Sequence, residues 1–187
     1  MLLKKLIRNI KIFLQTPKDF IYSFTFSTKK KVAINNYDPK STEIGNKYVT
    51  EIKEKFPELD THLIGSAGFE LAGRGDVDII SGCPIEQLSM YKESFTALFG
   101  KPIAIKHNFA EWNFFIDNRE VEITLIDKNS SQFLMQISQF CKIKNDAKLL
   151  AEYKELKNSA NQISMREYQR RKIGFFNKVN NKKFLNF

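Results

Sequence analysis

The segment Asp76-Val77-Asp78-Ile79-Ile80 restricts the fold of this chain more than any other short stretch. Polar and apolar residues alternate in it, and successive side chains of a β-strand point to opposite faces of a sheet. Asp76 and Asp78 are therefore expected on one face. Val77 and Ile79 are expected on the other face, in the core. The segment predicts a sheet with one buried face and one face that has room for two neighbouring carboxylates.

Apolar periodicity divides the rest of the chain into short strands and longer helices. Strands are predicted at His62–Gly65, Val77–Ile80, Ile103–His107, Trp112–Ile116 and Val121–Ile126. Helices are predicted over residues 42–56, 84–99, 130–141, 146–158 and 164–178. The polar segment 117–120 predicts a hairpin turn between the last two strands. This order of elements predicts an α/β or α+β domain with a small mixed sheet flanked by helices.

The net charge of +9 is concentrated at the two ends of the chain. Residues 1–31 carry eight lysines and arginines against one aspartate, and residues 166–187 carry seven against one glutamate. The stretch between them is therefore slightly acidic. Basic ends are usually solvated, but they also fit an anionic partner such as nucleotide phosphate, RNA or lipid headgroups.

Residues 2–14 predict a basic amphipathic helix, with leucine, isoleucine and phenylalanine along one stripe. Such a helix could lie on a membrane surface, act as a transit peptide, or pack on its own domain or on a second subunit. No apolar run approaches transmembrane length, and no secretory signal is expected. The simplest division is a basic extension over 1–31, one domain over 32–180 and a basic tail over 181–187.

The few cysteines and histidines limit the possible metal sites. Cys83 and Cys141 are far apart in sequence, as are His62 and His107, so no cage of cysteine and histidine ligands is expected. Two cysteines could form one disulfide but not a disulfide framework. We therefore expect a reducing, cytoplasmic setting.

A candidate phosphate- and metal-binding site surrounds the two aspartates. Neighbouring carboxylates raise each other's pKa unless a cation compensates, and Mg²⁺ prefers carboxylate and phosphate oxygens. Gly65 lets the backbone approach a ligand closely, Ser66 offers a hydroxyl and an N–H, and Arg74 can pair with phosphate oxygens. Glu122, on a predicted strand, is the expected third carboxylate of a two-metal site for phosphoryl transfer.

Other polar residues near this site have two interpretations. Glu120 shares the face of Glu122 but lies nearer the turn, so it is the weaker candidate for the third carboxylate. His62 either lines the site or bonds locally, and the local role is favoured. Lys172 on the last helix either reaches a nucleotide phosphate or extends along the helix surface.

The aromatic residues of the predicted strand at 112–116 also have two interpretations. Trp112, Phe114 and Phe115 could form a stacking platform for a base, but we expect them in the core. Tyr168 and Phe175, seven residues apart on the last predicted helix, are likewise expected to pack inward.

The candidate site resembles that of the nucleotidyltransferase superfamily, the fold of DNA polymerase beta and of the antibiotic nucleotidyltransferases. In that superfamily a Gly-Ser or Gly-Gly turn holds a nucleoside triphosphate. Two aspartates of one strand and a third carboxylate bind two Mg²⁺ ions. The resemblance implies that Gly65 and Ser66 contact phosphate. It also implies that Asp76, Asp78 and Glu122 bind metal.

Within this superfamily the chain most resembles the GrpB-like family, over about residues 32–180. The shared segments are YDP at 37–39, HLIGS at 62–66 and LAGRGDVDI at 71–79. Two patterns of the C-terminal helices are also shared, and they comprise Glu152, Tyr153, Leu156 and Lys157, then Tyr168, Lys172 and Phe175.

The chain departs from the GrpB-like pattern at the candidate metal ligands. Family members commonly carry an apolar residue in place of Asp76 and a His-x-His pair in place of Glu122 and Thr124. Arg74 stands where they carry lysine. The chain is thus nearer the three-carboxylate pattern of active nucleotidyltransferases.

These patterns lead to one main expectation for function. The chain is expected to use Mg²⁺ to transfer a nucleotidyl or related phosphoryl group from a nucleoside triphosphate to an unidentified acceptor. The alternative is an inactive binding module of the same fold that holds RNA, a protein or a membrane surface. In a third interpretation, the amphipathic helix at residues 2–14 forms the interface with a partner.

Overall fold

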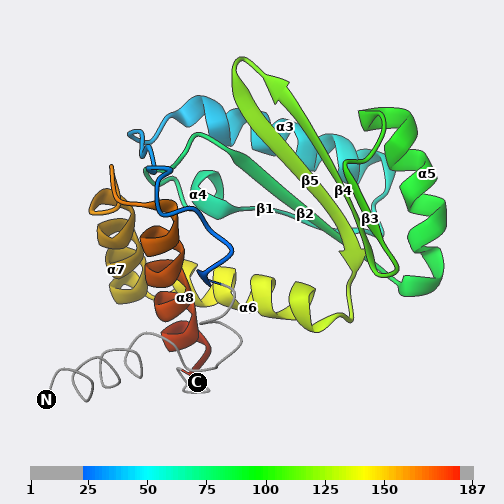
Figure 1. Cartoon of the computed structure of the whole chain (residues 1–187). Helices are drawn as coiled ribbons and strands as arrows, with labels where there is room; N and C mark the ends of the chain where they lie inside the picture. Colours follow the sequence, from blue (N-terminus) through cyan, green and yellow to red (C-terminus); the bar gives the residue numbers. More distant parts are fainter. Residues whose placement is uncertain (1–22, 182–187) are drawn as a thin grey trace, which may run out of the picture. The chain divides into compact units, whose positions relative to one another are not determined.

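The computed structural model describes residues 23–181 of the chain (Figure 1). The helix expected over residues 2–14 and the tail from residue 182 lie outside the described residues. Contacts divide the described residues into two compact units, one of residues 35–140 and one that joins residues 23–34 to residues 141–181. This division falls inside the 32–180 segment expected as one domain, so a single folding unit there stays a prediction.

A five-stranded mixed sheet forms the centre of unit 35–140, in the order β1-β2-β5-β4-β3. β2 pairs with β5 in parallel, and the other neighbouring pairs are antiparallel. The strands are β1 (Asp60–Ile64), β2 (Val77–Cys83), β3 (Ala104–Lys106), β4 (Phe109–Ile116) and β5 (Arg119–Asp127). Each overlaps a strand predicted from the sequence.

Helices precede, interrupt and follow these strands, which confirms the predicted fold class of a small mixed sheet flanked by helices. They are α3 (Pro39–Lys55), α4 (Gly65–Gly68), the 3₁₀ turn η1 (Ile85–Gln87), α5 (Leu88–Phe99), α6 (Ser131–Lys144), α7 (Ala147–Asn158) and α8 (Met165–Asn181). Among residues 23–181, no helix combines the length and apolar character needed to cross a membrane.

One face of the sheet is buried against α3 and α5. Val77 and Ile79 of β2 contribute to this core, as expected from their alternation with the aspartates. Trp112 and Phe95 fill its centre, with ring centroids 5.4 Å apart, and the indole Nε1 donates to the carbonyl of Gly100. The buried face therefore holds β2, β4 and β5 in place beneath the opposite, more polar face.

The opposite face is covered only in part. Ile80 and Ile126 are buried there by Phe133 of α6, with Ile137 packed against them. Ile80 is two residues after Asp78 in β2, so both side chains lie on this face. The face is therefore polar at Asp78 and apolar at Ile80.

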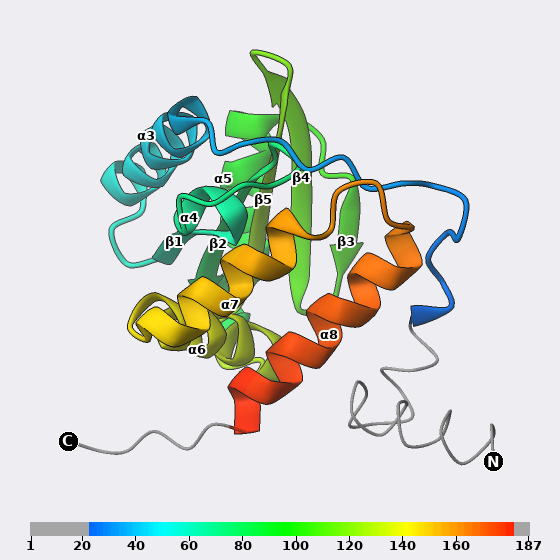
Figure 2. The same cartoon turned by 90° about the vertical axis from the view of Figure 1, so that its left-hand side faces the viewer.

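The β4–β5 hairpin turn occurs where the sequence predicted it. Asp117 and Asn118 have φ angles of 49° and 61°, which two-residue hairpin turns of type I′ require at both central positions. Aspartate and asparagine tolerate this left-handed conformation better than most residues. In Figures 1 and 2 the tip of this hairpin lies beside the start of α3.

α3 begins earlier than the predicted residue 42 because Asp38 caps it. Asp38 has an extended backbone, and its carboxylate accepts a hydrogen bond from the N–H of Lys40. Pro39 takes the first helical position, where its missing N–H costs nothing. The YDP segment therefore marks the start of a helix.

The second compact unit contains α7, α8 and residues 23–34. Tyr168 is buried with Val32 and Ala160, and Phe175 stacks on Tyr153 with centroids 5.1 Å apart. The inward packing predicted for Tyr168 and Phe175 is confirmed.

Replacing Phe95 with alanine tests the aromatic core. We expect Phe95→Ala to lower the free energy of unfolding by about 3–5 kcal/mol, because it leaves a cavity against Trp112. The control is Met90→Ala on the same helix, whose exposed side chain should make a difference within about 0.5 kcal/mol. Urea unfolding measures both, and equal losses would contradict the described packing.

Candidate functional site

The parallel pairing of β2 with β5 places Asp78 directly beside Glu122. Paired residues on neighbouring strands lie about 4.8 Å apart and point to the same face. Asn113 of β4 pairs with Glu122 from the other side. Two carboxylates that are 44 positions apart in sequence thus lie next to each other on the sheet. The sequence predicted that Glu122 would lie close to the aspartates.

Asp76 lies just before β2, and its carboxylate forms an ion pair with Arg74. The Asp76 side chain is 11% exposed, against 48% for Arg74. In the sequence analysis Arg74 was expected to pair with phosphate and Asp76 with metal. In the structure the two side chains pair with each other, so a ligand that took both roles would have to replace this ion pair.

Gly65 and Ser66 stand at the end of β1, where the four-residue helix α4 begins. Gly65 has a φ of 66°, and a Cβ at this position would collide with the carboxylate of Asp78. A glycine is required here both by the backbone conformation and by the close approach of the aspartate. Ser66 is buried, and its carbonyl accepts a hydrogen bond from Leu71. The turn thus lies in contact with the candidate metal ligands.

Burial and neighbouring carboxylates change the protonation of Glu122. Burial is the main cause that raises the pKa of Glu122 from 4.5 to about 7, and the negative charges of Asp78, Glu111, Glu120 and Asp76 add to it, in that order. Such an acidic cluster would be relieved by a cation. The site therefore has the charge that favours a divalent ion.

Two members of this acidic cluster were missed or ranked low from the sequence. Glu111 pairs with Thr124 across the sheet, and Glu120 accepts a 2.5 Å hydrogen bond from Asn113. Glu111 alternates with buried Ala110 and Trp112, so its face could have been predicted. Its approach to Glu122 could not, because that depends on the register of β4 against β5.

A cavity of about 620 Å³ lies next to this cluster within unit 35–140. Three chain segments line it: residues 35–41, the turn and loop of residues 66–76, and the hairpin of residues 115–120. Ser66, Arg74 and Asp76 are among the lining residues, so the structure brings together three of the predicted site residues. Its volume is in the range of small-molecule sites.

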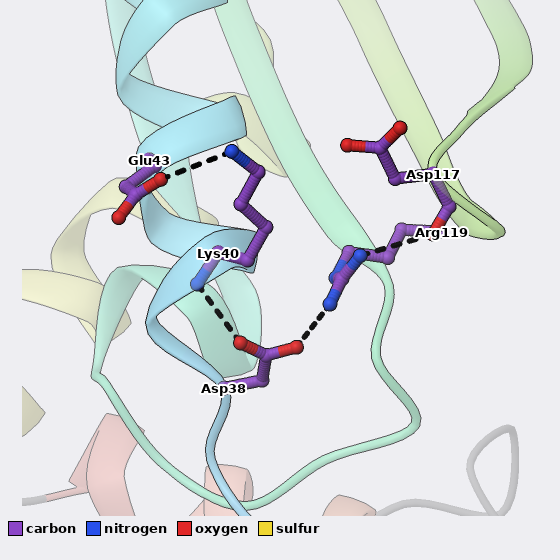
Figure 3. A network of polar contacts seen from close by, with 5 residues as sticks. All are labelled: Asp38, Lys40, Glu43, Asp117 and Arg119. Atoms are coloured by element: carbon purple, nitrogen blue, oxygen red, sulfur yellow. Dashed lines mark hydrogen bonds and ion pairs between the residues drawn. The ribbon is translucent and has the colours of Figure 1, made fainter.

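An ion pair joins two walls of the cavity. Arg119 of β5 donates to the carboxylate of Asp38 at the start of α3 and, at 3.0 Å, to the carbonyl of Asp117 (Figure 3). The guanidinium of Arg119 is the main cause that lowers the pKa of Asp38. This contact fixes the hairpin beside α3, and neither residue was singled out as a site residue from the sequence.

Phe115 corrects one of the sequence predictions. It was expected in the core, but 69% of it is exposed, and it lines the cavity. Trp112 is fully buried and Phe114 packs against the core, as predicted. The difference arises because Phe115 pairs with Glu120 and lies on the face opposite to Trp112 and Phe114, so it cannot share their core.

The carboxylates of the acidic cluster are suitable ligands for a hard cation, but their side chains are not arranged around one point in this structure. Carboxylates are ligands that Mg²⁺ prefers. In the part of the chain that the structure describes, no three histidine, cysteine, aspartate or glutamate side chains are placed to hold one metal ion. Asp76 is paired with Arg74 instead. A metal site of Asp76, Asp78 and Glu122 thus stays a prediction.

The remaining candidate residues lie elsewhere. His62 forms a 2.6 Å hydrogen bond with Asp60, the local role favoured from the sequence. Lys172 is on α8 in the second compact unit, with its Nζ 5.6 Å from the centroid of the Tyr168 ring. A phosphate contact for Lys172 stays a prediction.

Comparison with known proteins adds no assignment to this site. No protein-family model and no curated protein matches the chain.

A double-mutant cycle tests the contact between Gly65 and Asp78. We expect Gly65→Ala to cost about 2–4 kcal/mol of unfolding free energy, from left-handed backbone strain and the collision with the carboxylate. In an Asp78→Gly background only the backbone strain, about 1–2 kcal/mol, should remain, because the Asp78 Cβ, which would lie 3.1 Å from the new Cβ, is removed together with the carboxylate. Urea unfolding measures each corner of the cycle.

Gly100→Ala is the matched control for this cycle. Gly100 also has a positive φ, but a Cβ there meets nothing within 4 Å. Its cost should be the same with and without Asp78. Additive effects of Gly65→Ala and Asp78→Gly would contradict the close approach.

The raised pKa of Glu122 predicts a pH-dependent stability. Because the folded state binds this proton more tightly than the unfolded state, its contribution to stability is retained below the ordinary pKa of 4.5. That contribution is lost as the pH rises towards 7. Glu122→Gln should therefore raise the unfolding free energy at about pH 8, by on the order of 1–2 kcal/mol after allowance for partial exposure, and not at about pH 4.

The control for this experiment is Glu54→Gln, an exposed carboxylate on α3. It should give the same small difference at both pH values. If Glu122→Gln and Glu54→Gln change the unfolding free energy equally at both pH values, the acidic cluster does not destabilise the protein.

Proposed function

We propose that the chain is a Mg²⁺-dependent nucleotidyltransferase with the GrpB-like variant of the nucleotidyltransferase fold. The observation that carries the proposal is the register of Asp78 beside Glu122 on parallel strands, next to a cavity lined by Ser66, Arg74 and Asp76. The pair gives negative charge to attract a metal ion. The turn and the arginine give donors to attract phosphate.

Each residue has a role in the proposed site. Asp78 and Glu122 hold the metal, and Asp76 joins them when its partner Arg74 turns to the phosphates. Gly65 keeps the turn close to Asp78, and the hydroxyl of Ser66 donates to a phosphate oxygen. Bound Mg²⁺ would neutralise the negative charge that the phosphate oxygens carry during transfer.

The proposed reaction is a displacement at phosphorus. A hydroxyl or amine of the acceptor forms a bond to the α-phosphorus of a nucleoside triphosphate. The bond from that phosphorus to the bridging oxygen breaks, and the electron pair leaves with pyrophosphate while the acceptor loses a proton to solvent or to a carboxylate. The contribution of the protein is to position the phosphates and to balance their charge.

The localisation that we propose is cytoplasmic. Cys83 and Cys141 are both free thiols, which suits a reducing compartment.

Binding and turnover of nucleoside triphosphates test the proposal. We expect the full chain to bind ATP in isothermal titration only when Mg²⁺ is present, and to release pyrophosphate when a suitable hydroxyl or amine acceptor is supplied. Asp78→Asn should lower turnover by about 100-fold or more, because a metal at phosphate contributes several kcal/mol. Glu54→Gln, away from the acidic cluster, is the matched control.

The outcomes separate the proposed enzyme from the alternative. If ATP does not bind, or if Asp78→Asn binds ATP as tightly as the wild type does with Mg²⁺, the proposed site is wrong. If Mg²⁺-dependent binding occurs without pyrophosphate release for any acceptor, the chain is a binding module that retains the fold.

A further inference from the structure

The wall formed by the β4–β5 hairpin has a composition that the proposed metal site does not explain. Phe115 is the most exposed large hydrophobic residue in the part of the chain that the structure describes. Phe115 lines the same cavity as Ser66 and Arg74. An aromatic side chain kept in water costs free energy, so a ligand that covers it would gain from the contact.

The wall is held in a defined place. Arg119, four residues after Phe115, is paired with Asp38 and with the carbonyl of Asp117. The first contact joins the hairpin to α3, and the second closes the turn (Figure 3). The hairpin backbone that carries Phe115 is thus ordered before a ligand binds, which lowers the entropy cost of ordering this loop on binding.

The cavity combines the two features that a nucleotide needs. One wall carries Ser66 and Arg74, which can donate to phosphate oxygens. Phe115 lines the cavity from the hairpin, and a phenyl ring can stack on the flat face of a base. The volume of about 620 Å³ lies within the range of sites for nucleotide-sized ligands. Asn35, Asn36 and Asn118 line the same cavity and can donate to and accept from polar groups of a base.

We propose that Phe115 is the base-stacking residue of this cavity, so that the nucleoside lies on the hairpin wall and the phosphates lie towards Ser66 and Arg74. The inference rests on the proposed function for the identity of the ligand, but it concerns binding and does not require turnover. Since every base has a flat face, stacking on Phe115 allows any of the four bases.

The test compares a ligand that has a base with one that lacks it. The full chain is titrated with ATP and with inorganic tripolyphosphate, both with Mg²⁺. We expect ATP to bind about tenfold more tightly or better, and Phe115→Ala to remove this advantage while the affinity for tripolyphosphate stays unchanged. Phe115→Tyr should retain the affinity for ATP, because it keeps the ring.

Ile105→Ala is the matched control, since Ile105 is also a strongly exposed apolar residue in the same sheet but does not line the cavity. It should leave both affinities unchanged. The inference is overturned if tripolyphosphate binds the wild type as tightly as ATP does, or if Phe115→Ala binds ATP as the wild type does.

The two proposals fail in distinguishable ways. Pyrophosphate release that depends on Asp78 but not on Phe115 supports the enzyme and overturns the stacking role. ATP binding that depends on Phe115 without any pyrophosphate release supports the stacking role and overturns the enzyme. Absence of ATP binding overturns both.

Discussion

Asp78 and Glu122 lie side by side because β2 and β5 run parallel in a single register. A shift by one residue would send Glu122 to the apolar face and Val121 or Ile123 to the acidic one. The apolar face prevents that shift, since Val77, Val121 and Ile123 are all buried in the main core. Hydrophobic packing on one side of the sheet thus forces two like charges together on the other.

The acidic cluster lowers the stability of the folded state, because it places like charges close together. Burial and neighbouring carboxylates raise the pKa of Glu122 to about 7, because both disfavour a further negative charge at this position. Around the cluster, Arg74 and Arg119 each pair with a carboxylate, Asp76 and Asp38. All four of these residues line the cavity, so its walls contain both signs of charge.

Much of this arrangement could be predicted from local patterns. The alternation around Asp78 predicted its face, the polar segment 117–120 predicted the hairpin, and Glu122 was predicted as the partner carboxylate. The sequence also predicted that Gly65 lets the backbone approach closely, and the collision that a Cβ at residue 65 would make with Asp78 gives a physical reason for that glycine. The roles of these residues in binding metal and phosphate are still predictions.

The sequence by itself determined which residues alternate, where the β4–β5 turn lies, and which carboxylates face away from the core, because these depend on neighbours a few positions apart. Only the tertiary structure decided that Asp38 meets Arg119, that Glu111 adds its charge to Glu122, and that Phe115 remains exposed. These outcomes depend on the register of the strands and on which distant segments pack together. The spacing of residues along a short segment does not contain this long-range information.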